Sequence, residues 1–406
     1  MARATDPHTS PGTALIVGAS LAGLMSALTL ARTGVHTTLL ERSDDTGRTG
    51  AALHVQDGLL ERITGLPASQ APQPLAPGIQ TWFAVHGALR AAIETNPIIE
   101  LRQNTTVRKV GQDAHSVWVH TSDRQRITAD IVIGADGHRS TVRRHIAPEH
   151  PDATFAGYVI WIGIADESAI RALRWPQDVA FLGDNNNTLL GCPLPGVNGS
   201  HAPGSRRLGW AWYDSSRNGL LRSTGSVDGS VVRHSLMPAG IPNATFQELA
   251  AQARELFPSP WNAAILDSIE RRAVIGTPIA EYVPARLANG RVAIVGDAAH
   301  VPTPMTGSGF AESLYDAEAI ANAITTTTHR TRFSTNGTSL SISCVGLSLL
   351  RPSPPRPETR WRNRTIPKTV NGAVSQRYLL WKKASVWASR VYAMYVTAVA
   401  RPVTAR

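Results

Sequence analysis

The chain has 406 residues, of which 42% are hydrophobic and 17% are charged, so it is long enough for two domains with a large buried core. Its formal net charge of +10 would ordinarily suggest nucleic acid or an acidic membrane surface as a partner. Residues 326–406, however, hold 14 Lys and Arg against one acidic residue, which leaves 26 basic and 29 acidic residues, a net charge of −3, in positions 1–325. The basicity belongs to the C-terminal segment, and we expect no nucleic acid partner.

The cysteines and the hydropathy pattern exclude further classes. Only Cys192 and Cys344 are present, without a Cys/His cluster, so neither a disulfide framework nor a metal site is indicated. Residues 1–13 lack the apolar core of a secretory signal, and no stretch reaches the ~18 uninterrupted apolar residues of a spanning helix. We therefore expect a cytoplasmic protein without a metal ion.

The first predicted elements form a β-α-β unit, with a strand at 14–17, a helix at 21–32 and a strand at 37–40. Strand-like runs at 131–133 and 292–295 also lead into Gly/Asp turns and fit the same parallel sheet. The fold class that these runs predict is α/β, with a Rossmann-like dinucleotide-binding domain that is discontinuous in sequence.

The domain boundaries follow from a change of pattern between these runs. Residues 155–272 show alternating β patterns and loops rich in Asn, Gly and Pro, which predicts an inserted antiparallel-sheet domain for the substrate. The dinucleotide-binding domain then comprises residues 12–154 and 273–325. Residues 326–365 lack steady periodicity and favour an irregular or disordered segment, and residues 366–406 read as a basic helical tail.

The turn after the first strand reads GASLAG and predicts a dinucleotide site, with a purely structural turn as the alternative. Gly18 permits a tight turn, Gly23 lets the helix pack on the strand, and the helix N-terminus favours a pyrophosphate. Glu41 at the end of the second strand suits the ribose hydroxyls of adenosine, while Ser20 stands at the usual middle glycine and offers a hydroxyl instead. The expected binding residues are Gly18, Ser20, Leu21, Ala22, Gly23, Glu41 and Arg42.

Two later turns carry the second and third motifs. Residues 134–143 read GADGHRSTVR, for which the alternative is a surface turn, and residues 296–309 begin GDAAH and contain PMTGSG, for which the alternative is a simple helix cap. The helix that follows the third motif is expected to point its N-terminus at the cofactor, where it stabilises negative charge. The expected cofactor-binding residues here are Asp136, Gly137, Gly296, Asp297, Pro304, Gly307, Ser308 and Gly309.

The three motifs together resemble the FAD-dependent aromatic hydroxylase (para-hydroxybenzoate hydroxylase) superfamily over residues 12–325. The GxSxxG turn and the segments YVIWIGIADES, RRLGWAWYD and VRHSLMPAG look more like the 2,6-dihydroxypyridine 3-monooxygenase branch. The chain departs from that pattern at Ile162, where the branch has arginine, and at Ala311, where the family has asparagine. These departures bear on the substrate and leave the flavin fold intact.

The resemblance implies FAD as the cofactor and NAD(P)H as a co-substrate. In such enzymes NAD(P)H reduces FAD, oxygen forms a flavin C4a-hydroperoxide, and an aromatic or N-heteroaromatic ring is hydroxylated. Because only one Rossmann-type fingerprint is visible, the resemblance implies transient NAD(P)H docking beside the second motif, with Asp136 or Arg139 taking part. A homodimer is expected from the resemblance alone.

The sequence offers fewer candidate residues for the substrate than for the cofactor. His54 is the best candidate for a base that ionises a phenolic substrate, with a structural or surface histidine as the alternative. Trp161, Trp212 and Tyr213 are candidates for an aromatic pocket, although alternating aromatics in a sheet often belong to the core. His300 is assigned to the cofactor turn and not to a base.

The residues alone leave two other functions possible, and three explanations for the composition of the tail. The same scaffold serves other FAD-dependent oxidoreductases, such as dehydrogenases, reductases and halogenases, and the departures at Ser20, Ile162 and Ala311 also suit a catalytically degenerate dinucleotide-binding protein. The near loss of acidic residues in the tail suits an altered reading frame across about 325–365, a disordered connector, or a membrane- or acid-binding element. Any membrane association is expected only through this tail.

Overall fold

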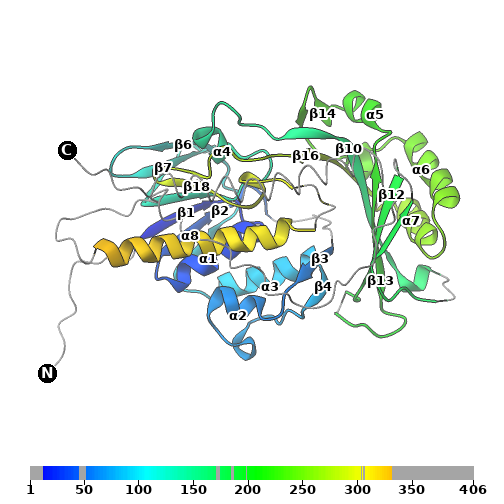
Figure 1. Cartoon of the computed structure of the whole chain (residues 1–406), viewed down its shortest axis with the longest axis horizontal. Helices are drawn as coiled ribbons and strands as arrows, with labels where there is room; N and C mark the ends of the chain where they lie inside the picture. The colour runs from blue at the N-terminus through cyan, green and yellow to red at the C-terminus, as the bar shows by residue number, and fades with distance from the viewer. Residues whose placement is uncertain are drawn as a thin grey trace, which may run out of the picture.

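The computed structural model of the chain contains two large sheets, one mainly parallel and one antiparallel, which lie side by side along the long axis of the molecule (Figure 1). This architecture confirms the predicted α/β class with an additional antiparallel sheet. The structure describes residues 12–44, 52–170, 174–183, 187–197, 199–302, 304 and 307–331.

The parallel sheet has the strand order β17-β18-β9-β1-β2-β5, and every neighbouring pair except β17 and β18 is parallel. Its central strands read as continuous apolar runs because both faces of the sheet are covered. The strands are β1 (Thr13–Val17), β2 (His36–Leu40), β5 (Ile99–Arg102), β9 (Ile131–Gly134), β17 (Ala288–Asn289) and β18 (Val292–Ile294).

Helices cover one face of the parallel sheet, and a small sheet covers the other. Ile16 and Ile133 point to the helical face, whereas Leu15 and Val132 point to the small sheet β6-β7-β8. The helices of this part are α1 (Leu21–Arg32), α2 (Leu59–Thr64), α3 (Trp82–Glu94), α4 (Thr141–Ile146) and α8 (Gly309–Thr331). The remaining strands of this part are β3 (Ala52–Val55), β4 (Gly78–Thr81), β6 (Val107–Gln112), β7 (Val117–Thr121) and β8 (Arg126–Ala129).

Helix α8 corrects one predicted boundary. We expected residues 326–365 to be irregular, but the helix continues to Thr331. Ile320, Ala321 and Ile324 are buried in the same core as α1, and the hydroxyl of Thr325 donates to the carbonyl of Ala321, so the threonine run continues a helix that packing has already fixed. The rest of that segment and the predicted basic tail at 366–406 lie outside the described residues.

The antiparallel sheet runs β11-β12-β13-β10-β15-β14, with β16 paired to the other edge of β10. Because β16 pairs with β10, the sheet extends beyond residue 272, where we had placed its end. The strands are β10 (Thr154–Asp166), β11 (Ala180–Gly183), β12 (Asn187–Leu194), β13 (Arg207–Asp214), β14 (Val227–Asp228), β15 (Val231–Val232) and β16 (Ile275–Glu281). Its helices are α5 (Asn218–Ser223), α6 (Asn243–Leu256) and α7 (Trp261–Glu270).

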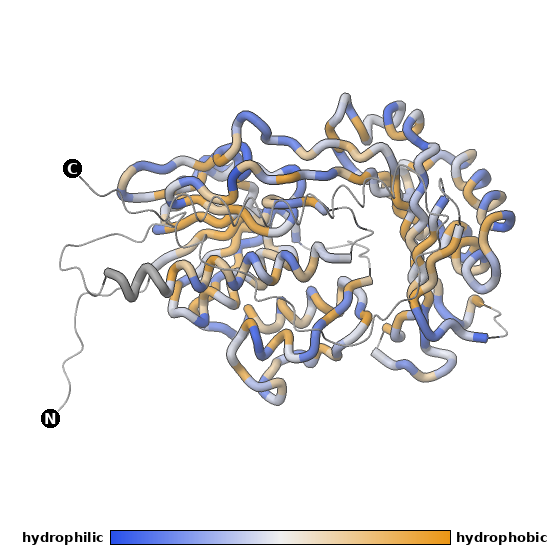
Figure 2. The backbone as a smooth tube through the Cα atoms, viewed as in Figure 1, coloured by the Kyte–Doolittle hydropathy of each residue, from blue (hydrophilic) through white to orange (hydrophobic). Residues whose placement is uncertain are grey.

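Strand glycines make room for large indoles in this sheet. A Cβ on Gly163 would lie 2.6 Å from the Trp210 ring, and a Cβ on Gly276 would lie 2.5 Å from the Trp161 ring. The hydrophobic residues follow the two sheets and the helix faces packed on them (Figure 2). No helix in the described part of the chain is long and apolar enough to cross a membrane.

Candidate active site

The three motifs lie at one edge of the parallel sheet. The first follows β1, the second follows β9, and the third follows β18, and these three strands are neighbours in the sheet. Glu41 follows β2, the next strand along. Since the carboxyl ends of parallel strands meet at one edge, all four segments converge on the crevice where α/β folds bind their ligands.

Close backbone approach between the motifs requires glycine at two positions. A Cβ on Gly18, whose φ is +101°, would lie 2.4 Å from the carbonyl oxygen of Ala135 in the second motif. A Cβ on Gly296, whose φ is +56°, would lie 2.6 Å from the Cβ of Ala22 on α1. Both backbones are in the left-handed region that favours glycine. The first motif therefore packs directly on the other two.

The turn at the start of α1 leaves polar groups directed at a ligand. The Glu41 carboxylate accepts hydrogen bonds from the amide of Ala19 at 2.8 Å and from the amide and hydroxyl of Ser43 at 3.1 and 2.9 Å. Ser20 is the N-cap residue of α1, yet its hydroxyl makes no capping hydrogen bond. The first amides of the helix and this hydroxyl together form a concentrated set of donors suited to an anion.

The aspartate of the second motif caps its own helix. The Asp136 carboxylate accepts hydrogen bonds from the hydroxyl of Ser140 and from the amides of Thr141, at 2.6 Å, and Val142, at 3.2 Å. Burial raises the pKa of Asp136, and these three donors oppose the rise. The carboxylate is thus engaged in holding the turn onto the N-terminus of α4.

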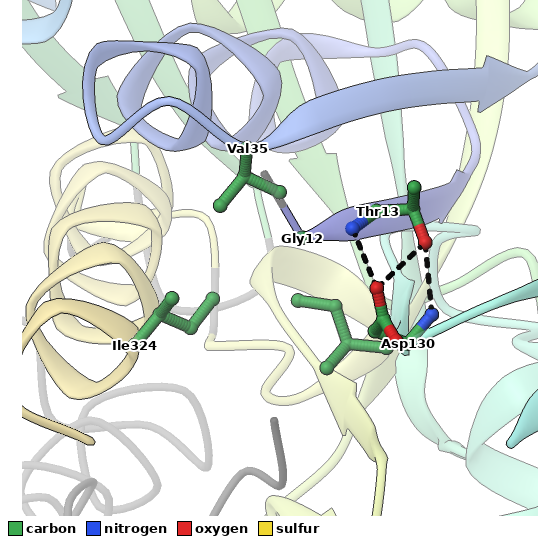
Figure 3. A pocket seen from close by; sticks show the side chains of 6 residues that line it. Gly12, Thr13, Val35, Asp130 and Ile324 are labelled. Carbon is green, nitrogen blue, oxygen red and sulfur yellow. Dashed lines mark hydrogen bonds between the residues drawn. The ribbon is translucent and has the colours of Figure 1, made fainter. Parts of the chain in front are cut away.

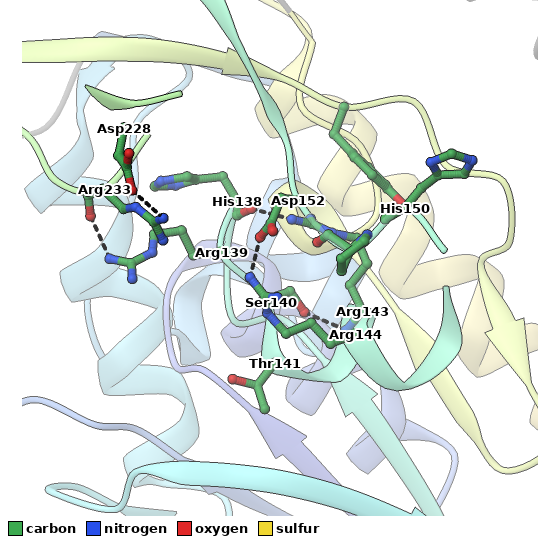
Figure 4. Close-up of polar contacts among 12 residues, drawn as sticks. His138, Arg139, Ser140, Thr141, Arg143, Arg144, His150, Asp152, Asp228 and Arg233 are labelled. Carbon is green, nitrogen blue, oxygen red and sulfur yellow. Dashed lines mark hydrogen bonds and ion pairs between the residues drawn. The ribbon is translucent and has the colours of Figure 1, made fainter. Parts of the chain in front are cut away.

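The second motif and the residue after it carry a group of basic side chains, His138, Arg139, Arg143 and Arg144 (Figure 4). Arg139 is exposed and donates to the carbonyl of Arg233, so it links this turn to the loop after β15. Burial and the charges of Arg139, Arg143 and Arg42 lower the pKa of His138 to about 4. The Nε2 atom of His138 is buried without a hydrogen-bond partner, which is consistent with a neutral ring at neutral pH.

Arg143, the last residue of the second motif, links that motif to the third through hydrogen bonds to Asp297 and Ala298. Figure 4 shows its side chain beside His138. Its side chain is fully buried. It donates to the carbonyls of Asp297 and Ala298 at 3.2 and 3.0 Å, to Pro151 at 2.8 Å, and to His138. Its guanidinium carbon lies 4.2 Å from the centre of the Tyr282 ring, an arrangement favourable to a cation–π contact.

Helix α8 contacts the third motif through the side chain of Asp316. The Asp316 carboxylate accepts from the amide of Gly296 and pairs with Nε2 of His300, each at 2.8 Å. Burial opposes protonation of His300, but the carboxylates of Asp316, Glu312 and Asp297 outweigh it and raise the pKa of His300 above its usual value. His300 therefore serves the architecture of this turn, as expected.

Asp297 follows β18 and is exposed, unlike its neighbours Gly296 and Ala298. Its side chain is accessible to solvent, although the protein around it desolvates the carboxylate and raises its pKa. A group that is both accessible and desolvated lies in a concave part of the surface. The turn then continues through Pro304, whose carbonyl accepts from the amide of Gly307, to Ser308 and to Gly309 at the start of α8. Met305 and Thr306 lie outside the described residues.

These groups fit a dinucleotide. The uncapped Ser20 and the first amides of α1 suit a pyrophosphate, Glu41 carries acceptors for ribose hydroxyls, and accessible Asp297 adds an acceptor at the neighbouring turn. The close packing at Gly18 and Gly296 brings the turns that carry these donors and acceptors together.

The antiparallel sheet separates the three predicted pocket residues. Trp161 and Trp212 are fully buried on the face that packs against α6 and α7, where Trp212 meets Phe257 edge to face at 5.1 Å. Figure 1 shows α6 and α7 on the side turned away from the parallel sheet. Tyr213 lies on the opposite face, with its ring 6.0 Å from that of Tyr158. The structure thus corrects the expectation for the two tryptophans, which are core residues, whereas the assignment of Tyr213 to the pocket stays a prediction.

The face with Tyr213 presents a row of apolar side chains. Phe181 pairs with Leu190, Leu190 with Ala211, and Ala211 with Ile162, so four neighbouring strands place one side chain each at the same level. Phe181 is 62% exposed, and the other three are partly buried. This apolar row is on the face opposite α6 and α7, and those helices lie on the side turned away from the parallel sheet (Figure 1).

His54 lies on β3, in the hairpin with β4, and its side chain is exposed. Strand β4 contacts β12, so the hairpin adjoins the antiparallel sheet. The assignment of His54 as a base stays a prediction.

A separate small pocket lies at the opposite, amino edge of the parallel sheet (Figure 3). Its lining includes Val35, Ile131 and Ile324, and it leaves essentially no room for a water molecule. Asp130 there accepts from the amide and the hydroxyl of Thr13 at 2.8 and 2.9 Å. These bonds join β1 to the turn before β9, so the pocket is structural and distinct from the crevice.

Sequence reasoning missed the roles of Arg143 and Asp316. Arg143 stands inside the second motif and Asp316 on the helix after the third, but Arg143 bonds the carbonyls of Asp297 and Ala298, 154 and 155 positions away, and Asp316 bonds the amide of Gly296 and the ring of His300, 20 and 16 positions away. A buried arginine that bonds only carbonyls leaves no spacing signal in the sequence.

Comparison with known proteins identifies the class. The FAD binding domain family matches residues 12–66 and 79–332, which is most of the chain. The chain therefore belongs to this family, and its cofactor is FAD. Its relatives place it in the FAD-dependent aromatic hydroxylase superfamily that the motifs indicated.

Individual relatives agree with that placement. The chain is 26% identical to the 2,6-dihydroxypyridine 3-monooxygenase of Paenarthrobacter nicotinovorans, over 76% of this chain and 82% of that protein. It is 23% identical to the 3-hydroxybenzoate 6-hydroxylase of Klebsiella oxytoca, over 77% and 79%.

Solved structures share the fold. The 2,6-dihydroxypyridine-3-hydroxylase from Arthrobacter nicotinovorans superposes with a TM-score of 0.61 at 22% identity, over 77% of this chain and 84% of that one. CtdE, solved in complex with FAD and a substrate, superposes with a TM-score of 0.56 at 15% identity, over 76% and 80%.

Proposed function

We propose that this flavoprotein uses NAD(P)H and O2 to hydroxylate an aromatic or N-heteroaromatic small molecule. The single observation that carries the proposal is the meeting of the three motifs at the carboxyl edge of the parallel sheet, beside an antiparallel sheet whose face opposite α6 and α7 carries the apolar row. When bound, FAD supplies the redox and oxygen chemistry. The protein binds, orients and shields the reactants.

For FAD, we assign the pyrophosphate to the turn from Gly18 to Gly23, with the hydroxyl of Ser20 and the first amides of α1 as donors. Glu41 and Asp297 are assigned to hydroxyl groups of the cofactor. Arg143 acts as a positioning residue, because it fixes the backbone of Asp297 from behind. Asp316 acts likewise through the amide of Gly296.

For NAD(P)H, we assign the surface beside the second motif. Arg42 and Arg139 are exposed there, and both are close enough to His138 to lower its pKa. Exposed guanidinium groups suit the phosphates of a nicotinamide cofactor. Asp136 takes no direct part in this assignment, because its carboxylate is engaged at the N-terminus of α4.

For the substrate, we assign the apolar row Phe181, Leu190, Ala211 and Ile162, with Tyr213 beside it. These side chains would cover one face of a flat ring and exclude water. Burial raises the pKa of Tyr213 well above its usual value, so its hydroxyl stays protonated and can donate a hydrogen bond. The relatives named above act on hydroxylated pyridine and benzoate rings, which makes hydroxylated rings the first substrates to test.

The test is the consumption of NADPH and NADH by the FAD-loaded protein in air, with and without hydroxylated pyridines, phenols and quinolines. The proposal predicts that one ring class speeds coenzyme oxidation and yields a product heavier by one oxygen atom, with that atom taken from 18O2. Coenzyme oxidation that no ring stimulates would favour a reductase on the same scaffold. A protein that binds FAD but oxidises neither coenzyme would favour the degenerate reading.

A further inference from the structure

The imidazole of His86 lies directly behind the turn that receives the FAD pyrophosphate. His86 is on α3, is only 6% exposed, and has its Nε2 atom 3.2 Å from the carbonyl oxygen of Ala19. Its ring stacks on the indole of Trp82, one turn earlier on the same helix, with centroids 4.4 Å apart and planes 14° from parallel. A buried, stacked imidazole is restricted in orientation, so its contact with Ala19 is well defined.

Both ends of Ala19 are therefore held, from two different elements. Its amide donates to Glu41 after β2 at 2.8 Å, and its carbonyl meets His86 on α3. A carbonyl can only accept, so Nε2 of His86 must carry the proton in this contact. The position of the preceding residue is also fixed, since the amide of Gly18 donates to the carbonyl of Leu40 at 2.9 Å.

This anchoring has a consequence for the next residue. In a trans peptide unit the carbonyl of one residue and the amide of the next point in opposite directions. With the carbonyl of Ala19 turned toward His86, the amide of Ser20 is turned away from α3, toward the space before α1. The hydroxyl of Ser20 makes no capping hydrogen bond, so the start of α1 does not engage it.

We propose that His86 is a positioning residue for FAD: by holding the carbonyl of Ala19, it aims the amide of Ser20 at the pyrophosphate. The imidazole contacts the turn and not the cofactor. Serine at this position has a Cβ that the usual glycine lacks, and the turn therefore benefits from an external anchor that keeps its backbone in one orientation. The proposal rests on the FAD site assigned above to the first motif.

The experiment compares three variants of the full chain. His86→Gln keeps an N–H donor of similar reach, His86→Leu removes the donor, and Trp82→Leu removes the stacking partner while leaving the imidazole. The affinity of each apoprotein for FAD is measured from the quenching of flavin fluorescence, and for ADP by calorimetry, since ADP carries the pyrophosphate without the flavin. The unfolding midpoint of each apoprotein is recorded in parallel.

We expect His86→Leu to weaken FAD and ADP by a similar factor, about five- to tenfold, as for one lost hydrogen bond. His86→Gln should stay within about threefold of the wild type, and Trp82→Leu should fall between them. Equal losses in His86→Gln and His86→Leu, or no loss in either, would overturn the proposal. So would losses that follow the unfolding midpoint and not the presence of a donor.

A different result would refute the assignment of the FAD pyrophosphate to the first motif. If ADP does not compete with FAD for the wild-type apoprotein, the pyrophosphate does not bind at this turn, whatever the His86 variants do. If ADP competes and the His86 variants bind FAD as the wild type does, only the role of His86 is refuted.

Discussion

In the parallel sheet, the groups assigned to the cofactor lie in loops at the ends of strands, whereas in the antiparallel sheet the groups assigned to the substrate lie along one face. The loop groups are held by backbone contacts between motifs, as at Gly18 and Arg143. The face groups are selected by side-chain alternation, which puts Tyr213 on one side and Trp212 on the other. One site therefore depends on backbone geometry, and the other on which face of a strand the helices cover.

The largest expected effect is at Gly18. In Gly18→Ala the new methyl group meets the Ala135 carbonyl at 2.4 Å and the backbone has φ +101°, so we expect a loss of at least about 3 kcal/mol in unfolding free energy and loss of bound FAD. Gly34→Ala is the matched control, because Gly34 has φ +85° with nothing within 4 Å. It should lose only about 1 kcal/mol and keep FAD. Urea unfolding and flavin absorbance measure both, and equal losses would mean that contact between the motifs is unimportant.

The next prediction concerns Arg143, which links the loops of the second and third motifs. Arg143→Met removes a fully buried guanidinium and leaves four carbonyls without their donor, and we expect a loss of about 3 kcal/mol or more together with weaker FAD binding. Arg144→Met removes a surface ion pair with Asp152 and should cost at most about 1 kcal/mol. The comparison uses chemical unfolding and FAD titration. If the two variants behave alike, Arg143 does not hold the third motif.

The two faces of the antiparallel sheet should respond in opposite ways. Trp212→Phe removes a buried indole whose Nε1 donates to Asn187 at 3.1 Å, so we expect about 2 kcal/mol of destabilisation with KM for the substrate unchanged. Tyr213→Phe should cost less than about 1 kcal/mol but raise KM about fivefold. Steady-state kinetics and thermal unfolding separate the two effects. The reverse pattern would place the substrate on the helical face.

The smallest effect concerns His138. Its folded-state pKa of about 4 lies below the usual 6.5, so the unfolded chain binds more protons between these values and stability falls as the pH falls from 6.5 toward 4. At about pH 5.5 this costs about 1 kcal/mol relative to neutral pH. His138→Asn should flatten the dependence of the unfolding free energy on pH in this window. An unchanged slope would show that His138 is not the titrating group.

The sequence predicted the cofactor-binding loops better than it predicted which face of the antiparallel sheet each side chain occupies, and the reason is physical. Positions such as Gly18, Gly296 and Asp297 carry backbone requirements that few residues satisfy, so the motifs were visible. In β10, however, residues 159–162 read VIWI, an apolar run without alternation, and its side chains are buried or partly buried on both faces of the strand. Nothing in that run shows which face the helices take.

Other features depended on contacts that close only in the folded chain. The pairing of β16 with β10 moved the end of the antiparallel sheet past residue 272, and α6 and α7 were not predicted within that domain. His86 stands on an ordinary amphipathic helix, and its contact with Ala19 spans 67 positions. The placement of His54 near the substrate and the proposed cytoplasmic location stay predictions.

The most direct test of the account is the absorbance spectrum of the purified protein loaded with FAD, followed in the same cuvette by NADPH and a panel of hydroxylated aromatics and pyridines under air. The account predicts flavin bands that bleach with NADPH, faster with one ring class, and that return as oxygen is consumed. A protein that cannot be loaded with FAD, or whose flavin is bleached at the same rate with every ring and with none, would contradict it.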